Sequence, residues 1–360
     1  MGKAQIRFVT GCWQNQNCKD SKNLELRQDT TVYFSENNRA MIFFKQLCLA
    51  FFLIFGHFAY SQKINSYSSS KRIPAPTVFA AGIISTGDYD SHPAFSPSGD
   101  TLYFIKCSPD FSTWTICVSY FRDRKWTIPE VAPFSGQYKE ADPFITNDGK
   151  TLYFISTRPV VKGGKKEDTD IWKMVKSDAG WSEPVHLEAP INSEGWEYYP
   201  TVADNGTLYF GSDRAGGLGN TDIYRAPLVD GKYSRVENLG ESINTKDDEY
   251  EPFISRDEGF LIFMGTSSGR GDLYVSYREM GGWTKAERLP EPICSETVEY
   301  SPKITPDGKY FFFSSTRNKY KQPFTSRDDY KKMQQRFNSS GNGLGDIYQV
   351  DISALGLKRK

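Results

Sequence analysis

The sequence predicts an all-β protein, a five-bladed β-propeller with four antiparallel strands in each blade. Three observations lead to this prediction. The chain repeats with a period of about 50 residues, a glycine-containing turn lies at the same offset in each repeat, and a strand rich in aromatic residues follows each turn. A period of this length is typical of solenoids, propellers and other arrays, and four strands in each repeat favour a propeller.

The clearest copy of the repeat covers residues 140–158. Pro143 lies near the start of the first strand, where a missing N–H costs little. Asp148-Gly149 is expected to supply the positive φ angles of a hairpin turn. The second strand, 151–155, is apolar on both faces, so both faces must be covered. The equivalent prolines of the five repeats are Pro93, Pro143, Pro200, Pro252 and Pro302.

Two further strands complete each repeat. The third begins with an aspartate followed by Ile or Leu and an aromatic residue, and the fourth begins near Trp126, Trp181, Tyr233 or Trp283. The fifth repeat lacks a fourth strand. Residues 76–84 resemble the segment that starts at Pro129, so we expect them to supply the outer strand of the last blade. This closes the ring and removes an exposed sheet edge. The alternative is six blades, although no stretch remains to build another.

The segments outside the repeats differ in composition. Residues 1–40 show no repeat and are expected to be a non-native leader or disordered. Residues 41–61 combine Lys45, an apolar run and small residues, as a secretory signal peptide beginning at Met41 does. The Ser-rich stretch 62–75 is expected to be a linker, 76–353 the propeller and 354–360 a tail. The mature protein is therefore expected in the periplasm or outside the cell, with no membrane span.

Composition excludes some functions and leaves the cysteines open. The chain has 44 basic and 44 acidic side chains and a net charge of zero, which does not fit a nucleic-acid-binding protein. Three cysteines follow the expected signal. Cys107 and Cys117 could form a cross-strand disulfide in an exported protein or remain two buried thiols, and Cys294 has no evident partner.

The complete motif resembles a known repeat. It reads Glu-x-x-Pro, strand, Asp-Gly-Lys, Leu-Tyr-Phe, Ser-x-x-Arg and Asp-Ile-Tyr, and it covers 76–353. This pattern is similar to the WD40-like β-propeller repeat of TolB-type periplasmic proteins. The resemblance implies a propeller used for protein interaction in the Gram-negative envelope. TolB has an additional N-terminal domain for which this chain has no room, so the partners of TolB are not carried over.

An acidic residue lies three positions before each of the five prolines. In a propeller the first strand of each blade lines the central channel, so these residues are expected to form a ring at the channel mouth: Asp90, Glu140, Glu197, Glu249 and Glu299. The ring is expected to share its face with Arg158, Arg214 and Arg317 and with Asp170, Asp222, Asp272 and Asp346. Clustered oxygen ligands suit calcium, the only metal we consider. The favoured alternative is structural, with each acid paired to its blade's arginine or to backbone N–H groups.

The fivefold pattern breaks next to this ring. The residues immediately before the prolines include His92, Tyr199 and Glu251, and tyrosines precede them in three repeats. Aromatic rings beside carboxylates favour a ligand-binding surface, and packing between the blades is the equal alternative for these amphipathic rings.

Residues 318–345 are an insertion in the last blade. Ser326-Arg327-Asp328-Asp329 resembles a capping box, and Tyr330, Met333 and Phe337 fall on one face of a short helix. Long insertions in compact domains often serve a function. We expect this one to cap or border the channel mouth, or else to dock on the next blade.

These observations predict a non-enzymatic exported propeller that binds an envelope protein or glycan and needs no cofactor. The alternatives are a propeller-type glycoside hydrolase, with Asp90, Glu197 and Glu251 as candidate carboxylates, and a calcium-dependent glycan-binding protein. Hydrogen-bonding of the acids separates these functions. Two free carboxyls in a sugar-sized cleft would favour the enzyme, and acids bonded to arginine or backbone would favour the binding module.

Overall fold

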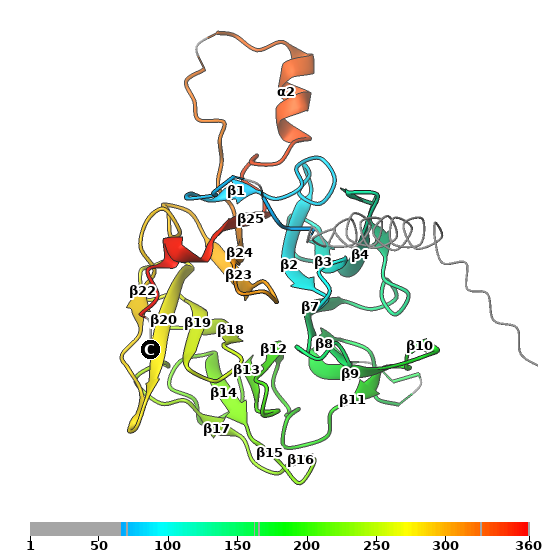
Figure 1. The fold of residues 1–360 in the computed structure, drawn as a ribbon, viewed down its shortest axis with the longest axis vertical. Coiled ribbons are helices and arrows are strands. Elements are labelled where there is room, and N and C mark those ends of the chain that lie inside the picture. Colours follow the sequence, from blue (N-terminus) through cyan, green and yellow to red (C-terminus); the bar gives the residue numbers. More distant parts are fainter. Residues whose placement is uncertain (1–65, 70, 162, 165, 325, 359–360) are drawn as a thin grey trace, which may run out of the picture. The chain divides into compact units, whose positions relative to one another are not determined.

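The computed structural model describes residues 66–358, apart from residues 70, 162, 165 and 325. The expected leader 1–40 and the expected signal peptide 41–61 lie outside the described residues. Within the described part, five antiparallel sheets stand around a central axis as the blades of a propeller (Figure 1). The fold class predicted from the repeats is confirmed.

Each blade has three long strands and a short outer edge. Blade 1 contains β2 (Tyr89–Phe95), β3 (Thr101–Cys107), β4 (Trp114–Arg122), β5 (Lys125–Trp126) and β6 (Glu130–Val131). Blade 2 contains β7 (Glu140–Ile145), β8 (Thr151–Ser156), β9 (Asp170–Ser177), β10 (Gly180–Trp181) and β11 (Val185–His186). Blade 3 contains β12 (Glu197–Val202), β13 (Leu208–Ser212), β14 (Asp222–Ala226) and β17 (Glu237–Asn238), with the hairpin β15 (Leu228–Val229) and β16 (Lys232–Tyr233) beside it.

The last two blades repeat this arrangement. Blade 4 contains β18 (Glu249–Ile254), β19 (Phe260–Gly265), β20 (Asp272–Glu279), β21 (Gly282–Trp283) and β22 (Glu287–Arg288). Blade 5 contains β23 (Glu299–Ile304), β24 (Tyr310–Ser315) and β25 (Asp346–Asp351), and the short 3-10 helix η1 (Ile352–Leu355) follows. Its fourth strand is β1 (Thr77–Val78), which pairs with β25 through Thr77 opposite Gln349 and Val78 opposite Tyr348. The predicted closure by residues 76–84 is therefore confirmed.

The second strand of each blade forms the core. It is covered by neighbouring blades on both faces, which is why its sequence is apolar at nearly every position. One aromatic position of the repeat is almost completely buried in all five blades, occupied by Phe104, Phe154, Phe210, Phe263 and Phe313. Aromatic rings also seal the closure, where Phe79 after β1 lies 5.0 Å, centroid to centroid, from Phe312 and 5.9 Å from Trp126. The two ends of the propeller are thus joined by packing as well as by strand pairing.

Two expectations about the backbone were wrong. Asp148 does not have a positive φ; Gly149 alone does, at 71°, and a tight turn closes through Gly149 N–H donating to the carbonyl of Thr146. The expected linker is not free of the propeller in its described residues. Tyr67 is 2% exposed and packs against Phe95 and Tyr310. The carbonyl of Ile73 accepts from Asp351 N–H, and Ile73 N–H donates to the Asp351 carboxylate.

The three described cysteines are free and buried. Cys107 pairs with Trp114 across β3 and β4, whereas Cys117 lies opposite Phe104, so the two thiols occupy different cross-strand positions. The structure therefore favours two buried thiols over a disulfide. No helix among the described residues has the length and apolar character needed to cross a membrane.

Candidate functional site

The acids of the predicted ring are buried inside their own blades. Glu140 shows the arrangement: its side chain is 0% exposed, Oε1 lies 3.0 Å from Nη2 of Arg158, and Ser156 donates to the same oxygen at 3.2 Å. Oε2 accepts from the hydroxyl of Ser135 at 2.9 Å and from the N–H of Gly136 at 3.1 Å. All these donors belong to the connection before the blade or to its second strand, so the carboxylate ties the two together.

Three of the other four acids also pair with a cation. Glu197 pairs with Arg214 at 3.0 Å, Glu299 with Arg317 at 3.4 Å and Asp90 with Lys106 at 2.7 Å. Glu249 has no cationic partner among the described residues, and Thr245 supplies its donors. Burial, only partly offset by those donors, raises the pKa of Glu249 to about 7.

The channel-mouth role expected for these five acids needs correction. Their carboxylates accept bonds within the protein, and none of them lines the cavity at the channel mouth: Asp90, Glu140, Glu197, Glu249 and Glu299. The structural alternative, with each acid bonded to its blade's cation or backbone, describes their geometry. Hydrogen-bond donors to these acids lie four or five residues earlier in the chain and near the end of the next strand. This spacing is a signal by which the sequence could have indicated a structural role.

The aspartates that start the third strands are also structural. Asp170 accepts from His186 at 2.9 Å, and Asp222 accepts backbone bonds from Leu218 and Gly219. Asp272 pairs with Arg288 at 2.9 Å. Asp346 accepts from Gly341 N–H, and burial raises its pKa to about 7. Asp222 and Asp346 fix the loops before their own strands, whereas Asp170 and Asp272 bond to the outer strands of their blades.

One buried group of residues has the composition of a metal site. Ligand atoms of Asp272, Cys294 and Glu299 lie within 4.8 Å of one another. Both carboxylates already have arginine partners, and burial raises the pKa of the Cys294 thiol to about 12. Cys294 bonds to the backbone N–H and carbonyl of Leu273 in the third strand of blade 4. Asn192 bonds in the same way to Ile171 in the third strand of blade 2. Cys294 therefore serves to hold the third strand of blade 4 in place.

The residue before each proline points into the channel. In each blade the first strand has a β-bulge at this point, and the residue has a positive φ of 46–57°. Such angles are uncommon outside glycine, and a bulge re-aims the side chain that it carries. The residues that occupy this layer are His92, Asp142, Tyr199, Glu251 and Ser301.

A polar network joins this layer across the axis. Nε2 of His92 lies 3.1 Å from Oδ1 of Asp142 and 3.2 Å from Oε1 of Glu251. The second oxygen of Asp142 accepts from Tyr199 N–H at 2.9 Å, and that of Glu251 accepts from Ser301 N–H. Tyr199 reaches across to donate to the carbonyl of Pro302 at 3.0 Å. All five blades are thereby connected at the centre of the ring.

Burial and the neighbouring charges shift the pKa values of this network in opposite directions. Burial raises the pKa of Asp142 despite the nearby His92. Burial alone would lower the pKa of His92, but the carboxylates of Glu251 and Asp142 raise it overall. The arrangement therefore favours a charged imidazolium held between two acids. Of the predicted ligand-binding residues, His92, Tyr199 and Glu251 are brought together here.

A cavity of about 380 Å³ opens above this network. His92, Asp142 and Glu251 form its polar part, and its walls are mostly aromatic. The aromatic lining residues are Tyr89, Phe111, Trp114, Tyr198, Tyr250 and Tyr300. We call it the mouth cavity. The tyrosines that precede the polar layer in the sequence thus face the cavity, and they also contact one another, with the rings of Tyr198 and Tyr250 6.1 Å apart.

Only the end of the insertion approaches the mouth cavity, where Leu344 packs against the cluster of Tyr89, Cys107 and Tyr300. Its helix α2 (Tyr330–Phe337) lies outside the ring of strands, beyond β1 and β25 (Figure 1), and no residue of 318–345 lines the cavity. The helix is confirmed, but its N-cap is Asp329, which accepts from Lys332 N–H at 2.8 Å, and not Ser326. The expectation of a cap over the channel was wrong, because the loop between the second and third strands leaves the blade outward.

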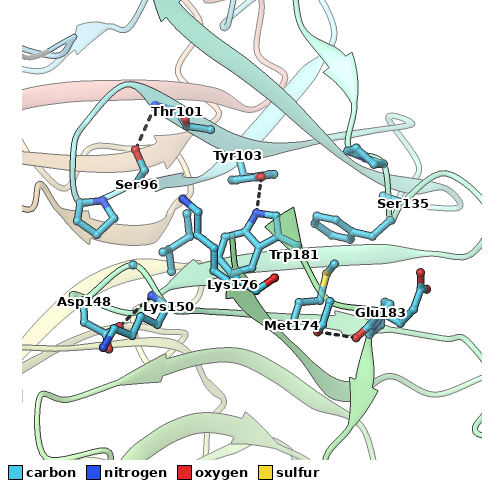
Figure 2. A pocket seen from close by; sticks show the side chains of 18 of the residues that line it. Ser96, Thr101, Tyr103, Ser135, Asp148, Lys150, Met174, Lys176, Trp181 and Glu183 are labelled. Atoms are coloured by element: carbon cyan, nitrogen blue, oxygen red, sulfur yellow. Dashed lines mark hydrogen bonds between the residues drawn. The ribbon is translucent and has the colours of Figure 1, made fainter. Parts of the chain in front are cut away.

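A further cavity, of about 1000 Å³, is a groove between blades 1 and 2. Figure 2 shows Trp181 donating across it to the hydroxyl of Tyr103, at 3.2 Å, with Met174 and Lys176 nearby. Other polar groups, such as Ser96 and Asp148, bond to their own turns. The groove is a gap between blades, and these polar groups form hydrogen bonds with other residues of its walls.

Comparison with solved structures found similar proteins. No family model and no curated protein matches the sequence. Solved structures that are similar include TolB from Acinetobacter baumannii, with 15% identity, a TM-score of 0.42 and coverage of 73% of this chain and 54% of that one. This chain therefore spans about half of that TolB. A putative TolB from Agrobacterium tumefaciens has 16% identity, a TM-score of 0.43 and coverage of 73% and 90%.

An α-L-arabinofuranosidase from Podospora anserina, solved with cellotriose, is similar at 12% identity and a TM-score of 0.45, covering 77% of this chain and 98% of that one. The similarity is one of fold. TolB structures are among these neighbours, as the repeat motif predicted. The neighbours include both TolB proteins and enzymes, so they do not distinguish between the candidate functions.

Proposed function

We propose that the protein is a non-enzymatic, exported propeller that binds a cationic side chain of an envelope protein in the mouth cavity. The observation that carries the proposal is the composition of that cavity. Six aromatic side chains form its walls, and the carboxylates of Asp142 and Glu251 lie at its polar end. This composition is absent from the fivefold repeat and arises only where the repeat's symmetry breaks.

An ammonium or guanidinium group suits such a cavity for two reasons. The face of an aromatic ring attracts a cation, with a contribution of about 0.5–2 kcal/mol for each good contact. Trp114 already receives a cation in this way, because Nζ of Lys139 lies 5.6 Å from its ring centroid. The carboxylate oxygens of Asp142 and Glu251 at the polar end of the cavity are acceptors that suit a cationic ligand.

The hydrolase alternative receives less support from the same geometry. A glycosidase needs one carboxyl to donate a proton and another to attack or activate water. Asp142 and Glu251 are each held by His92 on one oxygen and by a backbone N–H on the other. The five repeat acids are also bonded to donors inside the blades. Calcium-dependent binding by that ring lacks free oxygens for the same reason.

Location in the envelope follows from the sequence of residues 41–61. A signal peptide at this position would deliver the propeller to the periplasm or the exterior, where an envelope protein can reach the open cavity. Fusion of residues 41–75 to a reporter that is active only after export tests this part of the proposal.

Calorimetric titration tests the cationic ligand directly. The probes are acetylated lysine amide, acetylated arginine amide and the uncharged acetylated norleucine amide. We expect saturable binding of at least one cationic probe and at least about tenfold weaker binding of norleucine amide. Trp114→Ala should weaken binding by about tenfold, whereas Trp181→Ala, which changes a tryptophan of the groove between blades 1 and 2, should not.

Two results would overturn the proposal. One is norleucine amide binding as tightly as the cations, and the other is an equal effect of Trp114→Ala and Trp181→Ala. Thermal unfolding of both variants, measured beforehand, ensures that folded proteins are compared.

A further inference from the structure

The opposite end of the channel contains a second cavity, of about 270 Å³, made from the same positions of every blade. Residues two places after the prolines all line it: Phe95, Ile145, Val202, Ile254 and Ile304. The residues one place after the prolines contribute Ala94, Phe144, Phe253 and Lys303. We call it the lower cavity. Its inner wall is apolar except at Lys303, so one blade supplies an amine where three others supply Ala or Phe.

Lys303 contacts aromatic rings and forms no salt bridge with the described residues. Its residue is 6% exposed, and Nζ lies 4.1 Å from the ring centroid of Tyr199 and 4.9 Å from that of Phe144. Among the described residues no carboxylate forms a salt bridge with it, and the acids that act on it, Asp142 and Glu251, are bonded to His92. Arg256 and Asp257 also line the cavity, on the turn that follows β18.

These surroundings change the chemistry of the amine. Burial lowers the pKa of Lys303 to about 7, although Asp142 and Glu251 oppose the shift. About half of the amine is then neutral at pH 7, whereas an ordinary lysine with a pKa near 10.4 is almost entirely charged. A neutral amine in an apolar pocket is the state in which lysine acts as a nucleophile toward carbonyl compounds.

We propose that Lys303 is a covalent binding site for a small apolar aldehyde that enters the lower cavity. The volume is at the lower end of ligand pockets, which are typically about 300–1,000 Å³, so the aldehyde must be small. The aliphatic and phenylalanine side chains of the wall favour a hydrocarbon chain or ring over a charged compound. This site lies apart from the mouth cavity and does not depend on the function proposed for it.

The reaction needs no further reactant. The nitrogen lone pair attacks the carbonyl carbon, a C–N bond forms, and the C=O π electrons move to oxygen. A proton moves from nitrogen to that oxygen to give a carbinolamine. Loss of water, with the second nitrogen proton, leaves a C=N bond. Nothing is oxidised or reduced, and the water departs through the opening of the cavity.

Reductive trapping with peptide mapping tests this site on the full-length protein. The protein is incubated briefly with hexanal at pH 7, treated with borohydride, digested and analysed by mass spectrometry. We expect at least tenfold more modification of Lys303 than of Lys285, an exposed lysine in blade 4. The preference should fall at pH 10, where the surface amines also become neutral. Glyoxylate, a charged aldehyde, should modify Lys303 less than hexanal does.

A variant of the cavity wall separates binding in the cavity from unfolding. Ala94→Leu narrows the lower cavity, so it should reduce modification of Lys303 and leave that of Lys285 unchanged. Unfolding would instead make the two lysines equally reactive, which thermal unfolding would reveal. Modification of Lys303 no greater than that of Lys285 in the folded wild-type protein would overturn the proposal, as would no effect of Ala94→Leu in a folded variant.

Discussion

Nε2 of His92, in blade 1, lies 3.2 Å from Oε1 of Glu251, in blade 4, so the two residues bridge blades that are not neighbours in the ring. The same nitrogen contacts Asp142 of blade 2. The carboxylate of Asp142 is buried and that of Glu251 is partly buried, and each also accepts a backbone N–H from the next blade. The imidazole therefore supports the centre of the propeller.

Replacement of this imidazole should be destabilising in a pH-dependent way. The folded-state pKa of His92 is raised, so its contribution is fully present below the unfolded value of about 6.5 and is lost as pH rises through the folded pKa. His92→Gln should lower the free energy of unfolding by about 1.5–3 kcal/mol at pH 6 and by less at pH 9. Urea unfolding at the two pH values measures this. An equal loss at both would show that the charge of His92 is unimportant.

The repeat acids should respond to neutralisation according to their cations. Glu249 has a folded pKa of about 7, so the stability from its protonated form is complete below about pH 4.5 and is lost as pH rises through 7. Glu249→Gln keeps an acceptor for the Thr245 N–H, and the Thr245 hydroxyl can turn to accept from the new NH2 group. The substitution should raise stability by about 1 kcal/mol at pH 8, after allowance for screening, and little at pH 4.5.

Glu140→Gln is the matched comparison. Here the carboxylate faces Arg158 at 3.0 Å, and loss of its charge leaves a buried guanidinium without an anion. We expect destabilisation by about 3 kcal/mol at pH 8. Urea unfolding of both variants measures the contrast, and a shift in the same direction for both would contradict the assignment of the two environments.

The closure of the last blade can be tested at Phe79. Its ring contacts Phe95, Trp126 and Phe312 and is 6% exposed. Phe79→Ala should reduce the free energy of unfolding by about 3–5 kcal/mol, as buried phenylalanines usually do. Ile128→Ala, at a side chain that is 85% exposed, should change it by less than about 0.5 kcal/mol. Comparable effects would mean that the first strand contributes little to closure.

The insertion is anchored to blade 1 through Gly87. A Cβ atom at this glycine would overlap the backbone of Asn338, and Asn342 donates to the Gly87 carbonyl at 3.0 Å. Gly87→Ala should therefore displace the base of the insertion and increase proteolysis within 318–345. Gly281→Ala, with open space around the added atom, is the control. Unchanged cleavage in Gly87→Ala would show that the contact at Gly87 does not hold the base of the insertion in place.

The repeat made the architecture predictable, because turns and apolar strands recur at a fixed offset and the outer strand missing from blade 5 has a counterpart at 76–84. The site was less predictable. The acid three places before each proline was visible, but its burial depends on donors such as Ser135 and Arg158 that lie in loops outside its own strand. His92 and Glu251 were identified by their departure from the repeat, and Lys303 departs from it in the same way.

The sequence did not show in which direction particular side chains and the insertion point. The bulge at each proline turns one side chain into the channel, and no local pattern distinguishes that residue from the acid two places earlier. The outward course of 318–345 was missed for a similar reason, since hydrophobic periodicity at Tyr330 and Phe337 predicts a helix but not what it faces. Both residues are in fact exposed, at 70% and 61%.

The pairing of β1 with β25 sets an order for biosynthesis. Residues 77–78 are made early but acquire their neighbours only when 348–349 have been released from the ribosome. Until then Phe79 has no Phe312 against which to pack, and the nascent chain cannot complete its circle. A polypeptide in this open condition can still be threaded in extended form through a translocation pore, so late ring completion is compatible with transport before folding.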